Sequence, residues 1–372
     1  MKNCLIKARN QLMRDSYVSI LKPILFQFDA ENIHDSFISI GKTLGKYSAT
    51  RKISSFLWNY KNAALEQNIL GINFKNPVGL SAGFDKNANL VSLMSSLGFG
   101  FTEVGSITAR PYEGNAKPRL YRLPKEKSLR VNYGLKNLGA EVLHQQLENK
   151  KWALPLGINI AKTNSPLTSE INKGIEDYFF TYQTFQDVGD YFTINISCPN
   201  TCEEHPIFAE PQNLDLLLTK IFSIPKRKPV FVKISPDLGE AKLNDILDVC
   251  FKHQVDGFVC TNLTKVNILG HVGKGGFSGK LDEELSINVI RQVYKKIKEL
   301  PSNRVKPIII GVGGIFSSYD AYKKIKAGAS LVELITGMIF EGPQVISDIN
   351  LGLAELLKKD GYKNISEVVG KE

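Results

Sequence analysis

Eight short apolar segments with the composition of buried β-strands recur after about residue 70, and they constrain the fold more than any other feature. Segments with helical spacing separate most of them, for example residues 246–253 and 287–300. Strands that alternate with helices pair in parallel, because each helix returns the chain to the same end of the sheet. Eight such units over about 270 residues predict an α/β fold of the (β/α)8 TIM-barrel type, with a doubly wound open sheet as the alternative. The segments are residues 76–83, 101–106, 155–161, 191–197, 229–235, 257–262, 307–313 and 331–336.

Composition and charge exclude several classes of protein. Of the 372 residues, 43% are hydrophobic and 23% are charged, which excludes a collagen-like or wholly disordered chain. No apolar run approaches the roughly 18 residues that a transmembrane helix needs. The 47 Lys and Arg exceed the 37 Asp and Glu by 10. This excess favours an anionic ligand or an anionic membrane surface, or it is a solvated basic surface. No nucleic-acid-binding motif accompanies it, so we expect no nucleic-acid partner.

The N-terminal part of the chain differs from the rest in its charge and in its pattern of apolar residues. Its first 60 residues hold nine Lys and Arg but four Asp and Glu. Residues 1–16 are basic without a clear pattern, whereas residues 17–28 are apolar and aromatic. Asp29 is placed to cap a helix with one apolar stripe. The stripe consists of Ile33, Phe37, Ile40 and Leu44. We therefore expect two domains, a small amphipathic helical extension over residues 1–65 and a barrel over residues 66–372.

The cysteines indicate reduced thiols rather than disulfides, because their number is odd and no C-x-x-C pair occurs. Cys198, Cys202 and His205 lie close together, but their spacing is not that of a closed zinc site, so we expect no metal. Reduced thiols predict a reducing compartment, and the N-terminal residues lack the apolar core of a signal peptide, with a mitochondrial location as the alternative. The five cysteines are Cys4, Cys198, Cys202, Cys250 and Cys260.

Glycine-rich segments follow the last two predicted strands. Residues 311–314 read Gly-Val-Gly-Gly, and Thr336-Gly337 ends the eighth segment. In barrels, backbone N–H groups and a helix N-terminus at this position bind phosphate groups. The sequence therefore predicts a phosphate site, unless the glycines serve only a tight turn.

Polar residues stand at the ends of several other strands. Asn159, Asn195 and Asn262 carry amides, which suit a flat heterocycle with carbonyl and N–H edges, although local turn hydrogen bonds are an alternative. Lys233 lies in an otherwise apolar strand and indicates an anion or cofactor, or else a paired core lysine. Cys198 is a candidate base or nucleophile, or an inert buried thiol.

Together, these segments resemble those of the dihydroorotate dehydrogenase family, and in particular its quinone-linked, membrane-associated class 2. The resemblance extends from Tyr17 to about Gly370, with the motifs in the family's order. The motifs are LKPILFQFDAENIH, NPVGLSAGFDKNA, GFGFTEVGSIT, GNAKPRLYRLP, LGINIAK, TINISCPNT, VKISPDL, GGFSGK, PIIIGVGGI, AGASLVELITG and LLKKDGYKNISEVVG.

The resemblance implies an FMN-binding barrel that oxidises dihydroorotate to orotate in pyrimidine biosynthesis. Cys198 is the implied catalytic base, and Lys233 is implied to stabilise negative charge on the reduced flavin. The implied FMN contacts are Ala82, Gly83, Lys86, Ser106, Asn159, Asn195, Lys233, Thr261, Gly279, Gly314 and Thr336. The implied substrate contacts are Lys86, Asn132, Asn195, Asn200 and Asn262.

The resemblance also implies that a membrane quinone accepts the electrons through the N-terminal helices. The aromatic, basic and amphipathic character of these helices suits docking on an anionic membrane surface without crossing it. We therefore expect a peripheral protein on the cytoplasmic face of a bacterial inner membrane.

Three residues depart from the class 2 pattern. Cys198 stands where class 2 enzymes carry serine, and a thiol with an ordinary pKa of about 8.5 is the easier base. Val131 replaces a substrate-binding asparagine, with Asn132 adjacent, and Leu263 replaces a threonine. These losses of polar partners favour, as an alternative, an FMN-dependent relative that acts on a different planar substrate. A non-enzymatic FMN-binding barrel is a third hypothesis.

Overall fold

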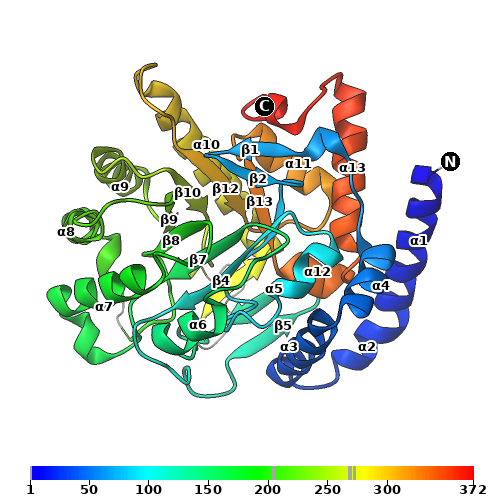
Figure 1. Ribbon diagram of the computed structural model, residues 1–372, viewed down its shortest axis with the longest axis horizontal. Coiled ribbons are helices and arrows are strands. Elements are labelled where there is room, and N and C mark those ends of the chain that lie inside the picture. The colour runs from blue at the N-terminus through cyan, green and yellow to red at the C-terminus, as the bar shows by residue number, and fades with distance from the viewer. Residues whose placement is uncertain (1, 203–205, 267–269, 271–273) are drawn as a thin grey trace.

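A closed barrel of eight parallel strands forms the centre of the molecule, as predicted, and helices surround it (Figure 1). The computed structural model describes residues 2–202, 206–266, 270 and 274–372. Each barrel strand coincides with one of the eight apolar segments. In barrel order the strands are β10 (Gly257–Cys260), β12 (Ile308–Val312), β13 (Leu331–Leu334), β3 (Val78–Leu80), β4 (Phe101–Ile107), β7 (Leu156–Ile160), β8 (Tyr191–Asn195) and β9 (Val230–Ile234).

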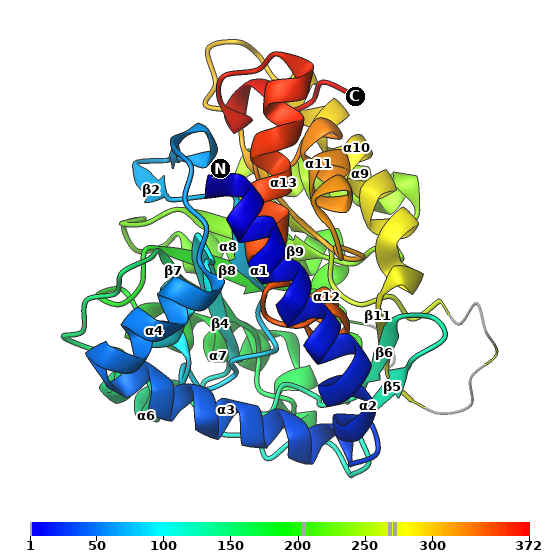
Figure 2. The same ribbon diagram turned by 90° about the vertical axis from the view of Figure 1, so that its right-hand side faces the viewer.

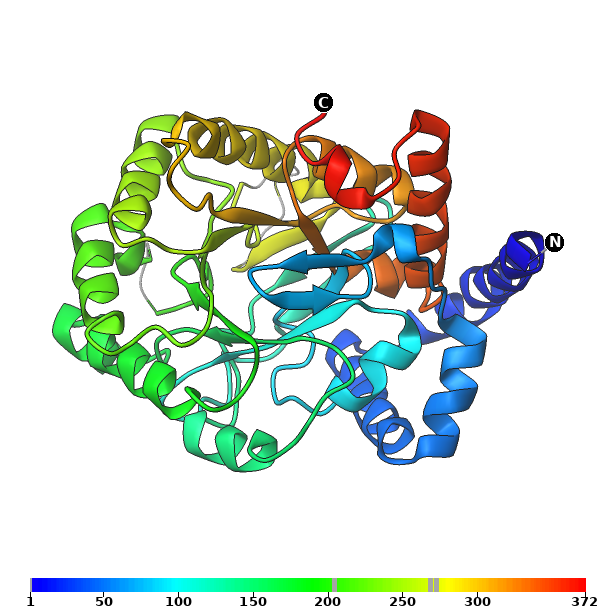
Figure 3. The same cartoon turned by 45° about the horizontal axis from the view of Figure 1, so that its top comes forward.

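A hairpin closes the amino-terminal end of the barrel. Strands β1 (Gln67–Ile69) and β2 (Ile72–Phe74) pair antiparallel, and Phe74 packs in one cluster with Phe101 and Tyr191 from the first positions of barrel strands. Figure 3 shows the hairpin lying across the strands. Gly157 leaves room for the Tyr191 ring, because a Cβ there would come within 2.4 Å of it. The hairpin does not cover the end of the barrel where the strands have their carboxyl ends, so a ligand site can form there.

The outer layer consists of helices that follow the strands. The helical spacing over residues 246–253 and 287–300 corresponds to α9 (Glu240–Lys252) and α10 (Glu283–Glu299). The apolar pattern does not reveal the first turn of either helix, because that turn is mostly polar. The helices after the extension are α5 (Val91–Met94), α6 (Ala140–Leu147), α7 (Ile171–Thr184), α8 (Pro211–Ile221), α9 (Glu240–Lys252), α10 (Glu283–Glu299), α11 (Ser318–Lys326), α12 (Thr336–Glu341) and α13 (Val345–Asp360).

A second, three-stranded antiparallel sheet stands beside the barrel. Strands β5 (Leu120–Leu123) and β6 (Ser128–Val131) come from the long connection between β4 and β7. Strand β11 (Gly276–Gly279) joins them from a segment far along the chain. This sheet fixes the register of Val131, which pairs with Leu120 on one side and Gly276 on the other.

The N-terminal extension is helical, as the sequence predicts. Its elements are α1 (Lys2–Ser16), a π-helical turn (Tyr17–Leu21), α2 (Lys22–Leu25), α3 (Ala30–Lys46) and α4 (Ser48–Trp58). The Asp29 side chain accepts a hydrogen bond of 2.9 Å from Asn32 N and caps α3 as predicted. The sequence pattern missed α1, which lies along α13 (Figure 2). Asn10 of α1 is buried there and donates to Asp348 at 2.7 Å.

Helix α3 packs two glycines, together with Ile38 and Leu44, against the rest of the protein and leaves two other large apolar residues exposed. Gly41 and Gly45 are buried against α5, where a Cβ on Gly41 would come within 2.5 Å of Leu90. Phe37 and Ile40 of the predicted apolar stripe are 42% and 54% exposed. Within the described residues, no helix combines the length and hydrophobicity that a bilayer crossing requires.

Candidate active site

A cavity opens at the carboxyl ends of the barrel strands, and nearly all residues nominated from the sequence line it. Two nominated residues do not. Asn159 lies behind Ser106, and Asn132 turns away, accepting a hydrogen bond of 3.1 Å from Asn115. Those that line the cavity are Ala82, Gly83, Lys86, Ser106, Asn195, Cys198, Asn200, Lys233, Thr261, Asn262, Gly279, Gly314 and Thr336.

A chain of buried polar side chains supports one wall of the cavity. Asn195 donates to Ser106 Oγ at 2.9 Å, and Ser106 donates to Asn159 Oδ1 at 2.5 Å. Asn159 in turn donates to the buried carboxylate of Glu103 at 3.0 Å. Asn262 donates to Asn195 Oδ1 at 3.2 Å. Each amide is therefore held in one orientation, which presents a fixed pattern of donors and acceptors to a ligand.

Two of the buried polar atoms that lack partners belong to cavity-lining residues nominated from the sequence. Within the described residues, neither Thr261 Oγ1 nor Asn200 Oδ1 has a hydrogen-bond partner. Buried polar atoms are normally paired, so these atoms indicate a polar ligand in the cavity. Val131 and Leu263 also line the cavity and contribute apolar side chains to it.

The base candidate Cys198 lines the cavity just beyond β8. The preceding Ser197 is fixed, because its hydroxyl donates to the Lys233 carbonyl at 2.8 Å. None of the five cysteines is in a disulfide. Burial raises the pKa of the Cys250 and Cys260 thiols, which agrees with a structural role for both. His205 lies outside the described residues, and among the described residues no cluster has the composition of a metal site.

Three residues gather at the end of the cavity that faces the extension. Lys86 Nζ lies 3.4 Å from His34 Nε2 and 3.9 Å from the centroid of the Tyr133 ring. Burial lowers the pKa of Lys86 to about 8. Burial and the Lys86 charge lower the pKa of His34 well below its ordinary value, which favours a neutral imidazole. His34 was not among the predicted site residues, because its position in the sequence gives no sign that it reaches a barrel cavity.

Lys233 faces the cavity from β9 and is almost fully buried. Within the described residues its Nζ makes one hydrogen bond, to Ser81 Oγ at 3.4 Å, and no ion pair. Glu333 lines the same cavity and was also not nominated. Burial and the nearby Glu103 raise the pKa of Glu333 well above its ordinary value, although the Lys233 charge acts to lower it. A lysine so placed retains donors for a ligand.

The glycine-rich segment after β12 forms an anion-binding cradle. Gly313 and Gly314 have φ of +108° and +68°, and with Ile315 they line the cavity. In the part of the chain that the structure describes, the backbone N–H groups of these three residues have no protein acceptor. The N–H groups of Thr336 and Gly337, at the start of α12, are likewise without one. Such converging N–H groups fit the phosphate group of a cofactor.

A buried ion pair holds α3 over this end of the barrel. Arg119 donates to both carboxylate oxygens of Glu31, at 2.7 and 3.0 Å, and both side chains are under 5% exposed. Lys117 and Lys136 lie 3.6 and 3.8 Å from the same carboxylate. The extension and the cavity are therefore joined by direct contacts.

Fold and site define a class of protein: a (β/α)8 barrel with a phosphate cradle beside a polar pocket that suits a planar ring. Comparison with known proteins narrows this class. The family model described as dihydroorotate dehydrogenase matches residues 64–357. The chain therefore belongs to the dihydroorotate dehydrogenase family, which makes it an oxidoreductase.

The relatives match over nearly their whole length. A protein of Haloarcula marismortui named dihydroorotate dehydrogenase (quinone) is 38% identical, with 95% of this chain and 98% of that protein aligned. One of Sulfurovum sp. with the same name is 39% identical, over 95% and 97%. The Eimeria tenella DHODH crystal structure in complex with ferulenol superposes with a TM-score of 0.77 at 30% identity, covering 92% and 95%.

Proposed function

We propose that this protein is an FMN-dependent dihydroorotate dehydrogenase that forms orotate for pyrimidine biosynthesis and passes the electrons to a membrane quinone. The observation that carries the proposal is the cradle of unpaired N–H groups at Gly313–Ile315 beside a polar pocket. The names of the relatives support the substrate and the quinone.

The residues present fit FMN. The cradle suits its phosphate group, and the unpaired Thr261 Oγ1 and the Lys233 ammonium suit the polar groups of the flavin. When bound, FMN supplies the capacity to accept a hydride from carbon and to release electrons singly or in pairs. The protein's part is to hold Lys233 at the flavin, where a cation favours negative charge on the ring.

Substrate binding and proton removal fall to other residues that line the same cavity. Asn195 and Asn262 hold each other in place, and Asn200 offers an unpaired oxygen, so the three amides suit the ring edges of dihydroorotate. Lys86 supplies a cation for the substrate carboxylate. Cys198 acts as the base that takes the proton next to the ring carbonyl.

A second candidate function rests on Val131 and Leu263. Both line the cavity with apolar groups, while Asn132 faces Asn115 instead. A site that offers fewer polar partners binds a polar ring more weakly, by about 1–3 kcal/mol for each group left unpaired. This arrangement favours an FMN-dependent oxidoreductase of the same family that acts on another planar substrate.

The extension supports the quinone and membrane parts of the proposal. Its helices expose large apolar side chains, with Phe56 at 78% and Ile53 at 61% on α4, in addition to Phe37 and Ile40 on α3. Amphipathic helices with basic residues bind the surface of an anionic bilayer. We therefore propose peripheral binding at the cytoplasmic face of a bacterial inner membrane, with residues 1–65 as the quinone domain and residues 66–372 as the catalytic domain.

Product analysis tests the proposal. Purified protein supplied with dihydroorotate and a short-chain quinone is expected to form one orotate for each quinone reduced. Orotate formation only with a different, soluble acceptor would overturn the quinone assignment. No orotate with any acceptor, from protein that retains FMN, would favour the second candidate function.

A further inference from the structure

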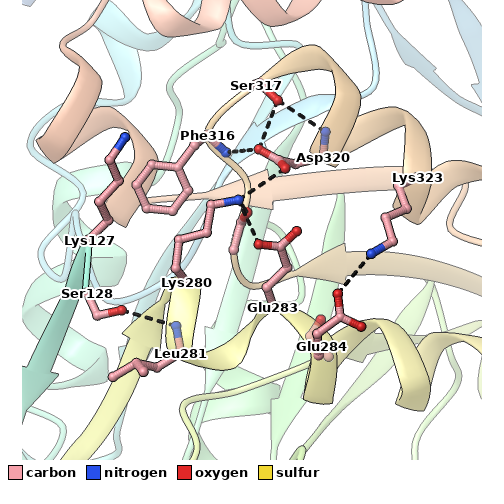
Figure 4. A network of polar contacts seen from close by, with 12 residues as sticks. Lys127, Ser128, Lys280, Leu281, Glu283, Glu284, Phe316, Ser317, Asp320 and Lys323 are labelled. Carbon is pink, nitrogen blue, oxygen red and sulfur yellow. Dashed lines mark hydrogen bonds and ion pairs between the residues drawn. The ribbon is translucent and has the colours of Figure 1, made fainter. Parts of the chain in front are cut away.

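The glycine-rich cradle is tied by Lys280, a residue that does not itself line the cavity (Figure 4). Lys280 follows β11, and its Nζ donates to Glu283 at 2.6 Å, to Asp320 Oδ1 at 3.1 Å and to the Gly314 carbonyl at 3.4 Å. The same ammonium lies 5.1 Å from the centroid of the Phe316 ring. One side chain thus joins β11, α10, α11 and the cradle.

Asp320 extends this tie to the next peptide of the segment. Its second oxygen, Oδ2, accepts from Phe316 N and from Ser317 Oγ, both at 2.9 Å. Ser317 in turn accepts from Asp320 N at 3.3 Å and caps α11. Lys280 therefore holds the segment at two points, directly at Gly314 and through Asp320 at Phe316.

These two contacts set the direction in which the cradle amides point. Across a trans peptide the C=O and the following N–H point in opposite directions. The Gly314 carbonyl is bonded to Lys280, so the N–H of Ile315 points the other way. Gly313 and Gly314 both have positive φ, and glycines have wide conformational freedom, so the segment needs such ties to keep one shape.

Charge adds to this effect. Glu283 and Asp320 place two carboxylates near a cradle that is built for a phosphate group, and Lys280 is the cation that bonds to both. Without Lys280, these two negative charges would face an approaching phosphate group with less compensation.

We propose that Lys280 is a positioning residue for the cofactor phosphate: it orients the backbone N–H groups of Gly313–Ile315 and offsets the charge of Glu283 and Asp320. This inference rests on the proposed FMN-dependent function. Because Lys280 acts only on the phosphate end of FMN, its loss is expected to lower the affinity for a flavin that carries the phosphate group and not for one that lacks it.

The test compares FMN with riboflavin, which lacks the phosphate. Each flavin is titrated into flavin-stripped full-length protein, and the dissociation constant is read from the quenching of flavin fluorescence. Lys280→Met is expected to weaken FMN binding roughly ten- to a hundredfold, because charged hydrogen bonds are lost, while riboflavin binding stays within about twofold. Lys280→Arg, which keeps the charge and the donors, is expected to restore most of the FMN affinity.

Lys323→Met is the matched control. Lys323 lies on α11 and pairs with Glu284 at 2.9 Å (Figure 4), and within the described residues it makes no hydrogen bond to Gly313, Gly314 or Ile315. Its replacement removes the same charge from the same neighbourhood and is expected to leave FMN binding within about twofold of wild type, as surface ion pairs contribute little. Equal losses in the two Met variants, or wild-type FMN affinity in Lys280→Met, would overturn the proposal.

A second variant keeps the test decisive if Lys280→Met does not fold. Asp320→Ala removes the indirect tie together with one of the two carboxylates. The loss of the tie is the larger effect in this proposal, so the variant is expected to weaken the binding of FMN but not of riboflavin. Unchanged FMN affinity in folded Asp320→Ala would overturn the positioning role. Stripped wild-type protein that binds neither flavin would instead overturn the proposed function, so the two failures are distinguishable.

Discussion

Cys198 stands at the end of a strand whose last residues are fixed by hydrogen bonds, and its proposed role is removal of a proton from the substrate. Cys198→Ala is expected to slow flavin reduction by dihydroorotate about 10²- to 10⁴-fold, because the base is lost while the flavin site is untouched. Rapid mixing of substrate with protein that still carries flavin measures this. Cys198→Ser is expected to keep more activity and to need a higher pH, since a hydroxyl is a weaker acid than a thiol. Reduction at the wild-type rate in Cys198→Ala would contradict the assignment.

Lys86 gives the site a predictable pH dependence. Burial lowers its pKa to about 8, with Asp35 acting to raise it and Lys136 to lower it. A lysine is charged below its pKa, so the affinity for anionic dihydroorotate is expected to be constant below about pH 8 and to fall above it. The half-saturating dihydroorotate concentration for flavin reduction, followed from pH 6 to 10, measures this.

A variant separates Lys86 from other titrating groups. Lys86→Arg keeps its charge over the whole range, because a guanidinium has a pKa above about 12, and its half-saturating concentration is expected to stay flat. An identical rise above pH 8 in both proteins would assign the titration to another group.

Residue placement shows what the sequence could and could not provide. Ser106, Asn195 and Lys233 were nominated because they stand at strand ends, and the barrel brings all strand ends together. Asn132 was nominated because it is adjacent to Val131, which stands where the family carries a substrate-binding asparagine. The pairing of β6 with β5 and β11 fixes that register, and neighbouring residues of a strand face opposite sides, so Val131 lines the cavity and Asn132 does not.

At the scale of elements, the buried barrel strands were predictable and the segments with distant partners were not. Each barrel strand is a continuous apolar run because both of its faces are buried. Strand β11 is glycine-rich, and its partner β6 lies about 145 residues earlier. Helix α1 has no clear apolar stripe, because polar Asn10 anchors it to α13 while Leu5 and Leu12 are 72% and 69% exposed.

Helix α3 depends on the buried pair between Glu31 and Arg119. Glu31→Gln is expected to lower the free energy of unfolding by about 3 kcal/mol, because the Arg119 charge stays buried without its partner. Denaturant unfolding measures this. Glu170→Gln is the matched control: its pair with Lys173 is exposed, and a change below about 0.5 kcal/mol is expected. Equal stability of Glu31→Gln and wild type would show that the pair does not hold the extension.

At the scale of the whole molecule, the exposed apolar residues of α3 and α4 mark the proposed membrane-binding face. The double variant Ile53→Ser and Phe56→Ser is expected to reduce co-sedimentation with phosphatidylglycerol vesicles several-fold, because apolar area is lost from the face that enters the bilayer surface. The rate at which dihydroorotate reduces the flavin of this variant in solution is expected to equal that of the wild type. Val305→Ser, which removes an equally exposed side chain (80%) from the barrel, is the control and is expected to bind vesicles normally.

The central claim is that this cavity binds FMN and oxidises dihydroorotate although Val131 and Leu263 replace polar residues. Anaerobic stopped-flow mixing of the purified protein with dihydroorotate, followed by flavin absorbance, tests it most directly. Rapid and complete bleaching of the flavin is the predicted result. Flavin that dithionite bleaches but dihydroorotate does not would contradict the claim and assign the site to a different planar substrate.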